Sequence, residues 1–201
     1  MKHLNKAAAA FAALATVGLS SLPAQAADFA IDTSHAFAQF SVNHLGYSNM
    51  LGRFNKFTGD ISFDEGNIAA SKVNVSIETA SIDTNHEKRD AHLRSPDFFN
   101  TGEFPTMTFT STKVEKTGDR SGKVTGNLTL LGVTKPVTLD VTFNKAAVHP
   151  FDGAKPADQQ RFVVGFSATG AIKRSDFGMK YALPAVGDTI SLQLEAEAIR
   201  K

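Results

Sequence analysis

The stretch RDAHLRSPDFF, residues 89–99, places two arginines, two aspartates and a histidine directly before two phenylalanines. Side chains of these types can exchange protons, hold a metal ion or bind an anion. Three kinds of site are compatible with them: a catalytic cluster, a metal site, or a cap that is wet on one side and apolar on the other.

A metal site has little support from the spacing. His86, Asp90 and His92 lie close together in the chain, and His44 could join them. His86 and His92 are six residues apart and face different sides of a helix, unlike the two histidines of an H-E-x-x-H motif. We expect no metal, and we keep as the alternative a metal-binding stress protein or an enzyme that uses His44, His86, His92 and Asp90.

Motifs for nucleophilic or nucleotide chemistry are missing from the sequence. There is no G-x-S-x-G elbow, and Ser95 lacks the flanking glycines. The letters DFG occur in RSDFGM, residues 174–179, without the companion motifs of a kinase. Phosphate-binding loops and dinucleotide fingerprints are also absent. We therefore expect no catalytic residues of these kinds and no cofactor.

The first 26 residues have the three-part layout of a secretory signal peptide. A short basic start precedes an alanine-rich apolar run at residues 7–19, and Ala24-Gln25-Ala26 is a small-x-small cleavage pattern. The apolar run is shorter than the roughly 20 residues that span a bilayer. We predict cleavage after Ala26, export to a bacterial periplasm, one soluble domain over residues 27–201, and no stable membrane span.

The composition excludes some partners and some kinds of stabilisation. The chain has 21 basic and 20 acidic residues, and losing Lys2 and Lys6 with the signal would leave 19 against 20. This balance gives no electrostatic case for binding nucleic acid. With no cysteine, the fold must be held by burial and sheet hydrogen bonds. The 16 phenylalanines, with no tryptophan, can line a large apolar interior without hydrogen-bond partners.

Alternation of apolar and polar residues is the dominant pattern, and it predicts half-buried β-strands. Turn signals rich in glycine, proline and aspartate separate the strands. Their length favours a barrel over a sandwich, so we predict an all-β, eight-stranded antiparallel barrel with one short helical excursion. The expected strands cover residues 35–45, 57–64, 71–81, 106–116, 122–132, 135–146, 161–172 and 188–199.

One segment breaks this alternation. Residues 85–93 contain helix formers without glycine or proline, and Pro96 ends the run. We predict a helix there with Asp83 or Thr84 as its N-cap.

The residue pattern leaves two possibilities for the barrel interior. Large inward side chains such as Phe109 alternate with small ones such as Gly126. This mixture fits either a filled core with interdigitating side chains or a ligand channel. His44, at the end of an inward apolar face, fits either a core histidine or a polar group at a cavity mouth.

Four stretches spread over nearly the whole chain beyond the signal carry a family resemblance. They are FSVNHLGYSNMLGRFNKFTGDISFD, SIDTNHEKRDAHLRSPDFFNTGEFPTMTFTST, GNLTLLGVTKPVTLDV and IKRSDFGMK, of which the second is the most specific. The chain resembles the YceI-like polyisoprenoid-binding proteins of bacteria, which are exported lipocalin-like barrels. The resemblance implies an elongated barrel that holds a long isoprenoid chain, and a binder or carrier rather than an enzyme.

With this resemblance, the interior is expected to be a channel. Affinity for an isoprenoid tail must come from removing apolar area from water, at about 25 cal/mol per Å². The predicted apolar lining is Phe40, Val42, Phe57, Phe63, Val75, Ile77, Phe109, Leu128, Phe166 and Ala168. The candidates for a polar mouth, which would meet a head group, are His44, Arg89, His92 and Arg94.

The charged stretch of residues 89–99 then becomes a cap. Leu93, Phe98 and Phe99 would pin it to the barrel, with its charges turned outward or toward the head group. The expected partner is an isoprenoid lipid such as a quinone or a polyprenyl compound. The sequence leaves open the ligand's identity, a role as carrier, scavenger or sensor, whether the chain forms a homodimer, and which end of the barrel opens.

Overall fold

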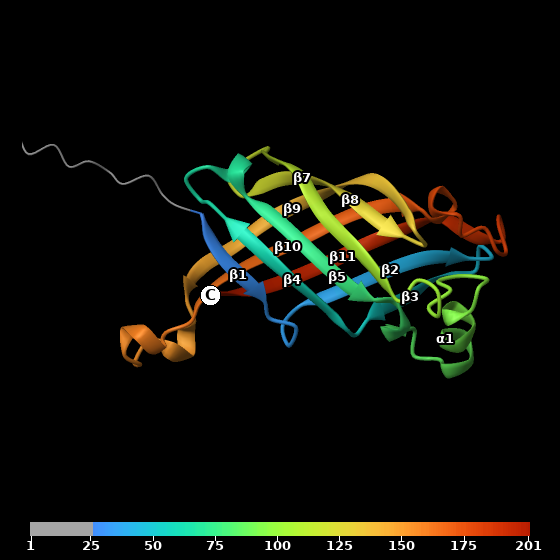
Figure 1. Ribbon diagram of the computed structural model, residues 1–201, viewed down its shortest axis with the longest axis horizontal. Helices are drawn as coiled ribbons and strands as arrows, with labels where there is room; N and C mark the ends of the chain where they lie inside the picture. Colours follow the sequence, from blue (N-terminus) through green and yellow to red (C-terminus); the bar gives the residue numbers. More distant parts are fainter. Residues whose placement is uncertain (1–25) are drawn as a thin grey trace, which may run out of the picture.

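Long antiparallel strands dominate the computed structural model, which describes residues 26–201 (Figure 1). Residues 1–25 lie outside this range, so the signal peptide predicted over residues 1–26 stays a prediction. The strands are β1 (Ala27–Ile31), β2 (Phe37–His44), β3 (Ser48–Phe54), β4 (Phe57–Phe63), β5 (Lys72–Glu78), β6 (Ile82–Asp83), β7 (Thr106–Lys116), β8 (Ser121–Leu130), β9 (Val133–Val148), β10 (Phe162–Lys173) and β11 (Val186–Arg200).

The helical elements are all short. There is one α-helix, α1 (Glu87–Arg94), among the described residues. The 3-10 turns are η1 (Ile68–Ala70), η2 (Thr79–Ser81), η3 (Pro150–Asp152), η4 (Ala157–Gln159) and η5 (Arg174–Phe177). No helix within residues 26–201 is long and apolar enough to cross a membrane.

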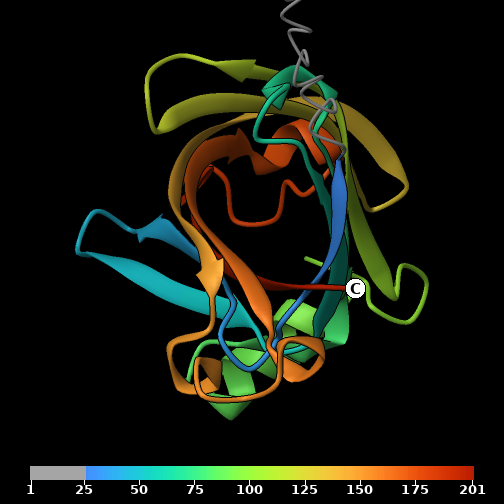
Figure 2. The ribbon, with the colours of Figure 1, turned by 90° about the vertical axis from the view of Figure 1, so that its left-hand side faces the viewer.

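The strand segments join into a closed ring in chain order. Six of the segments form three long, interrupted strands: β1 with β2, β3 with β4, and β5 with β6. The first long strand pairs with the second through β1–β4 and β2–β3, and the second pairs with the third through β4–β5 and β3–β6. β11 closes the ring by pairing with both β1 and β2. The view along the barrel shows this closure (Figure 2). The predicted elongated, eight-stranded antiparallel, lipocalin-like barrel with one short helical excursion is confirmed.

Two of these interruptions, at residues 55–56 and 79–81, lie side by side in the wall. The amide of Asn55 donates to the carbonyl of Ser81 (3.1 Å), and the amide of Glu78 donates to that of Lys56 (3.0 Å). Thr79 is fully buried there and donates its hydroxyl to the carbonyl of Phe104 (2.7 Å). Beyond these interruptions, α1 and the residues after it extend from β6, while the β2–β3 hairpin projects from the barrel.

The barrel therefore has two different ends, which lie at opposite sides of Figure 1. We call the right-hand one the hairpin end and the left-hand one the loop end. The hairpin end consists of the β2–β3 turn (residues 45–47), α1 and residues 174–185, and the loop end consists of residues 64–71, 117–120 and 149–161.

Three strands and one helix cap differ from the sequence prediction. The strands β1, β3 and the two-residue β6 were not predicted. β3 was missed because Gly52 stands on its inward face, where the ring of Phe40 covers it. The helix begins at Glu87, since Asn85 has a left-handed φ of 60° that an α-helix cannot include. The predicted N-caps Asp83 and Thr84 were wrong, because the cap is His86.

Candidate functional site

A cavity of about 810 Å³ occupies the inside of the barrel. This volume lies within the range of roughly 300–1,000 Å³ of known small-molecule sites. Its lining includes Tyr181 and Ala182 at the hairpin end and Lys116 and Arg120 at the loop end. The cavity therefore extends along the barrel from one end to the other.

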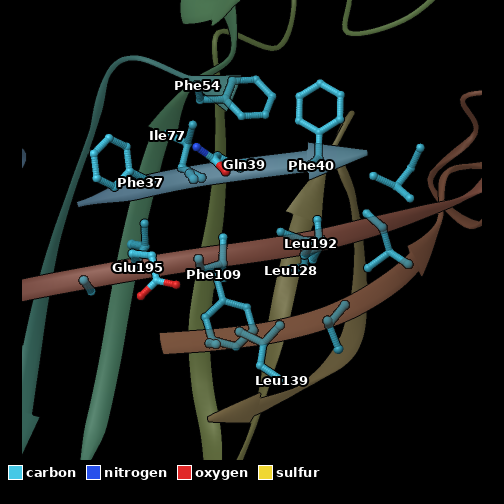
Figure 3. A pocket seen from close by; sticks show the side chains of 18 of the residues that line it. Phe37, Gln39, Phe40, Phe54, Ile77, Phe109, Leu128, Leu139, Leu192 and Glu195 are labelled. Atoms are coloured by element: carbon cyan, nitrogen blue, oxygen red, sulfur yellow. The ribbon is translucent and has the colours of Figure 1, made fainter. Parts of the chain in front are cut away.

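The wall of this cavity is mainly apolar. Figure 3 shows side chains from several strands around it, among them Phe40, Phe109 and Leu192. Every residue of the predicted apolar lining lies on this wall: Phe40, Val42, Phe57, Phe63, Val75, Ile77, Phe109, Leu128, Phe166 and Ala168. Their contact with a ligand stays a prediction. The cavity is also lined by residues that were not predicted, among them Phe54, Met107, Leu139, Leu192 and Leu194.

Glycines in the wall explain how so many phenylalanines leave the interior hollow. A Cβ atom on Gly52 would lie 2.3 Å from Cζ of Phe40, and one on Gly126 would lie 2.4 Å from Cζ of Phe109. Real Cβ atoms cannot approach a ring this closely, so each glycine makes room for the ring of a neighbouring strand. The rings lie against the wall instead of crossing the lumen.

The polar groups at the hairpin end are held by a small network around Thr84. Arg89 donates from Nε to the Thr84 hydroxyl and from Nη2 to the Thr84 carbonyl, both at 2.7 Å. Buried Asp90 accepts from the Thr84 amide (3.0 Å) and the Thr84 hydroxyl. Thr84 and Arg89 both line the cavity. The network therefore fixes a cationic donor at this end of the apolar space.

His92 belongs to an aromatic cluster that joins two segments of the hairpin end. Its ring lies edge-on to Phe98 and to Tyr181, with centroids 5.1 and 5.2 Å apart, and Phe98 also contacts Tyr181. Its Nε2 lies 2.7 Å from Oδ2 of Asp97. All three rings line the cavity, as does His44 at the end of β2. We call His92, Phe98 and Tyr181 the aromatic clasp.

Arg94, the fourth predicted polar residue, lies elsewhere. Its guanidinium donates to the carbonyls of Ala80 (2.8 Å) and Ile82 (2.9 Å), and it is not part of the cavity lining. Five residues turn a helix by about 140°, so Arg94 cannot share the direction of Arg89. Its position fastens α1 to the chain around β6.

Arg174 is a cavity-lining residue that the sequence analysis passed over. It is buried and donates to the carbonyls of Met179 (3.1 Å), Val186 (2.9 Å) and Gly187 (2.9 Å). Burial lowers its pKa from the usual value of 12.5. Because all three acceptors are backbone oxygens, Arg174 shapes the loop that carries Tyr181. Only its place in the RSDF stretch could have drawn attention to it.

The residues of the metal or enzyme alternative are not brought together. His86 caps α1 through Nδ1, Asp90 binds Thr84, and His92 faces Asp97. Within residues 26–201 no group of three or more potential ligands could hold a metal ion. The alternative built on His44, His86, His92 and Asp90 therefore gains no support from the geometry.

The turn after β1 contains a hydrogen-bonded cluster of Asp32, Ser34 and His35. Ser34 Oγ and Asp32 Oδ2 both contact Nδ1 of His35, at 3.0 and 2.9 Å. In a catalytic triad the serine and the carboxylate bind different ring nitrogens, so this turn is not one. The contact with His35 lowers the pKa of Asp32 to about 2, and that with Asp32 raises the pKa of His35.

The loop end contributes a more charged lining that the sequence analysis did not predict. Lys72, Lys116, Asp119 and Glu65 all lie on the cavity wall there. Arg120 donates from Nε to the carbonyl of Phe143 (2.9 Å) and from Nη2 to that of Asn144.

Comparisons with known proteins agree with this architecture. Residues 29–198 match the family described as the YceI-like domain. The chain is 45% identical over 189 residues to Protein YceI of Escherichia coli O157:H7, covering 93% of this chain and 94% of that protein.

Two solved structures share the fold. BcnA of Burkholderia cenocepacia superposes with a TM-score of 0.73 at 22% identity, covering 83% of this chain and 98% of that one. A polyisoprenoid binding domain from Saccharophagus degradans, implicated in plant cell wall breakdown, superposes with a TM-score of 0.62 at 15% identity. It covers 88% of this chain and 100% of its own.

Proposed function

The chain belongs to the YceI-like family, and we propose that it binds a long-chain isoprenoid, or a similar amphiphilic lipid, inside its barrel without catalysing a reaction. The observation that carries this proposal is the cavity of about 810 Å³ with its apolar wall. Each buried CH₂ group of a ligand contributes about 0.8 kcal/mol, reduced by the ordering of a flexible chain. A tail without hydrogen-bonding groups suits this wall.

The head group would lie at the hairpin end. Arg89 is held there by Thr84, and His44 and His92 lie on the same part of the lining. These side chains supply hydrogen-bond donors for a quinone oxygen or a phosphate. The polyisoprenoid binding domain from Saccharophagus degradans supports the ligand class through its shared fold.

The same proposal includes export. A signal peptide over residues 1–26 would deliver the domain of residues 27–201 to a periplasm, where an apolar cargo needs shelter from water. A carrier or a reservoir of isoprenoid lipid fits that compartment.

Filling the cavity tests the proposal. Ala168 lines the cavity, whereas Ala171 lies exposed on the same strand, β10. We expect Ala168→Phe to abolish binding of an isoprenoid quinone measured by titration, and Ala171→Phe to leave it unchanged. In a hollow interior the added ring replaces empty space, so the free energy of unfolding should change by less than about 1 kcal/mol.

Two results would overturn it. One is a wild-type protein that binds neither quinone nor polyprenyl compounds. The other is an Ala168→Phe variant that keeps wild-type affinity. Overpacking of a solid interior would instead cost roughly 1–3 kcal/mol of stability, which denaturant unfolding of the two variants detects.

A further inference from the structure

The tip of the β2–β3 hairpin exposes apolar side chains to an unusual degree. Tyr47 is 88% exposed and Leu45 48%. Leu51, in the middle of β3, is 71% exposed. Leu45 and Gly46 have φ values of 56° and 77°, so the chain reverses in a tight turn that holds Leu45 and Tyr47 at the extremity. Figure 2 shows the hairpin projecting away from the barrel wall.

This hairpin carries no formal charge except Arg53, near the base of β3. Residues 37–52 contain no Asp, Glu, Lys or Arg, in a chain of which 20% of the residues are charged. A projecting hairpin in contact with water alone would gain nothing from such a composition. A surface that enters an apolar environment does gain, because burying an unpaired charge there costs several kcal/mol.

The tip lies beside the cavity mouth at the hairpin end. The amide of Leu45 donates to the carbonyl of Ala185 (2.9 Å), which joins the turn to the loop that carries Tyr181. Tyr181 is itself half exposed and belongs to the aromatic clasp. His44, directly before Leu45, lines the cavity. The exposed apolar surface and the interior are therefore continuous at this end.

We propose that the tip of this hairpin, with Leu45, Tyr47 and Tyr181, docks the barrel mouth on the surface of a lipid bilayer. The inference rests on the proposed function, since the proposed cargo resides in bilayers and avoids water. Tyrosine suits this role because its ring enters the interfacial region while its hydroxyl stays hydrated. Contact of the mouth with the bilayer lets an isoprenoid tail move between them without full exposure to water.

The loop end also exposes an aromatic side chain, but among charged residues. Phe151 is also 88% exposed there. It adjoins Asp152, which is paired with Lys155 (2.7 Å) and Arg161 (2.6 Å). Bringing Phe151 into a bilayer would desolvate these charges, so this end is expected to stay in water.

A second copy of the chain is the competing occupant of the hairpin. β3 pairs with β6 only at Arg53 and Phe54, so the edge of its first residues is open to another strand. Docking on a bilayer and strand pairing between copies predict different results with the same variants.

Flotation with phosphatidylcholine vesicles that contain no quinone tests the docking. We expect the double variant L45S/Y47S to reduce the vesicle-bound fraction of the full exported chain about tenfold or more. Phe151→Ser should leave that fraction unchanged. Because residues 37–52 of the hairpin carry no formal charge, raising the salt concentration should alter wild-type binding little.

The outcomes separate docking from ligand binding. Absence of wild-type flotation would overturn the docking, and so would equal losses in L45S/Y47S and Phe151→Ser. Dissociation of a wild-type dimer by L45S/Y47S, with no flotation of either protein, would assign the tip to a second copy instead. Titration with a short-chain, water-soluble quinone is a separate measurement that L45S/Y47S should not change, and its failure in the wild type would count against the proposed function alone.

Discussion

The two ends of the barrel use similar pieces in different surroundings. Both have an arginine that donates to backbone carbonyls, Arg174 at the hairpin end and Arg120 at the loop end. Both expose an aromatic side chain, Tyr47 and Phe151, to the same extent. At the hairpin end the arginine is buried and the aromatic tip is uncharged, whereas at the loop end the arginine is exposed and the aromatic stands among ion pairs. Exposure of an aromatic side chain alone therefore does not identify a functional surface. The charge of the residues around that side chain distinguishes the two ends.

The largest expected effect comes from the arginine pair. Arg174→Met leaves three carbonyls at the hairpin end without their donor, and we expect a loss of about 3 kcal/mol in the free energy of unfolding. Arg120→Met removes donors from exposed carbonyls that water can satisfy, so the loss should stay below about 1 kcal/mol. Urea unfolding measures both. Equal losses in the free energy of unfolding would contradict this difference between the two ends.

A smaller effect is expected where a glycine makes room for a ring. Gly126→Ala brings a Cβ within 2.4 Å of the Phe109 ring and 2.7 Å of the Thr110 carbonyl oxygen, so the ring has to swing toward the lumen and the backbone has to shift. We expect a loss of roughly 1–2 kcal/mol in stability and weaker binding of a quinone.

Gly102→Ala is the matched control, because a Cβ there meets no atom within 4 Å. Unchanged ligand affinity in Gly126→Ala would show that the Phe109 ring does not limit the width of the channel.

The smallest effect concerns the pH response of the loop end. The side-chain hydrogen bonds of Arg161 and Lys155 hold the pKa of Asp152 well below its usual range. A lowered pKa contributes stability that is present above about pH 4 and is lost as the pH falls through the folded-state value. The amide protection factors of residues 150–161, which are corrected for the intrinsic pH dependence of exchange, should therefore fall on acidification before those of the hairpin end. Asp152→Asn should remove this pH dependence, and an unchanged pH response in that variant would refute the assignment.

His35, in the turn after β1, should contribute to stability with the opposite dependence on pH. Asp32 raises its pKa, so its contribution is full below pH 6.5 and is lost as the pH rises through the folded-state value.

Alternation along the strands made most of the fold predictable. Each inward residue of the expected lining occupies the wall because a strand directs every second side chain to the same face. β3 escaped prediction because Gly52 serves a ring on another strand, and no pattern within β3 itself reveals that.

Side-chain direction at the hairpin end was harder to predict. Arg89 and Arg94 have the same chemistry, but the start of α1 after Asn85 determines which one lines the cavity. The role of Arg174 depends on carbonyls of residues up to 13 positions away, which local spacing does not encode.

Native mass spectrometry of the protein purified without detergent shows whether the hollow apolar interior holds a lipid. We expect one lipid adduct per chain, with the mass of an isoprenoid compound, that is absent from Ala168→Phe and retained in Ala171→Phe. Repeated preparations that show only the bare mass of the chain, and that take up neither quinones nor polyprenyl compounds, would contradict it.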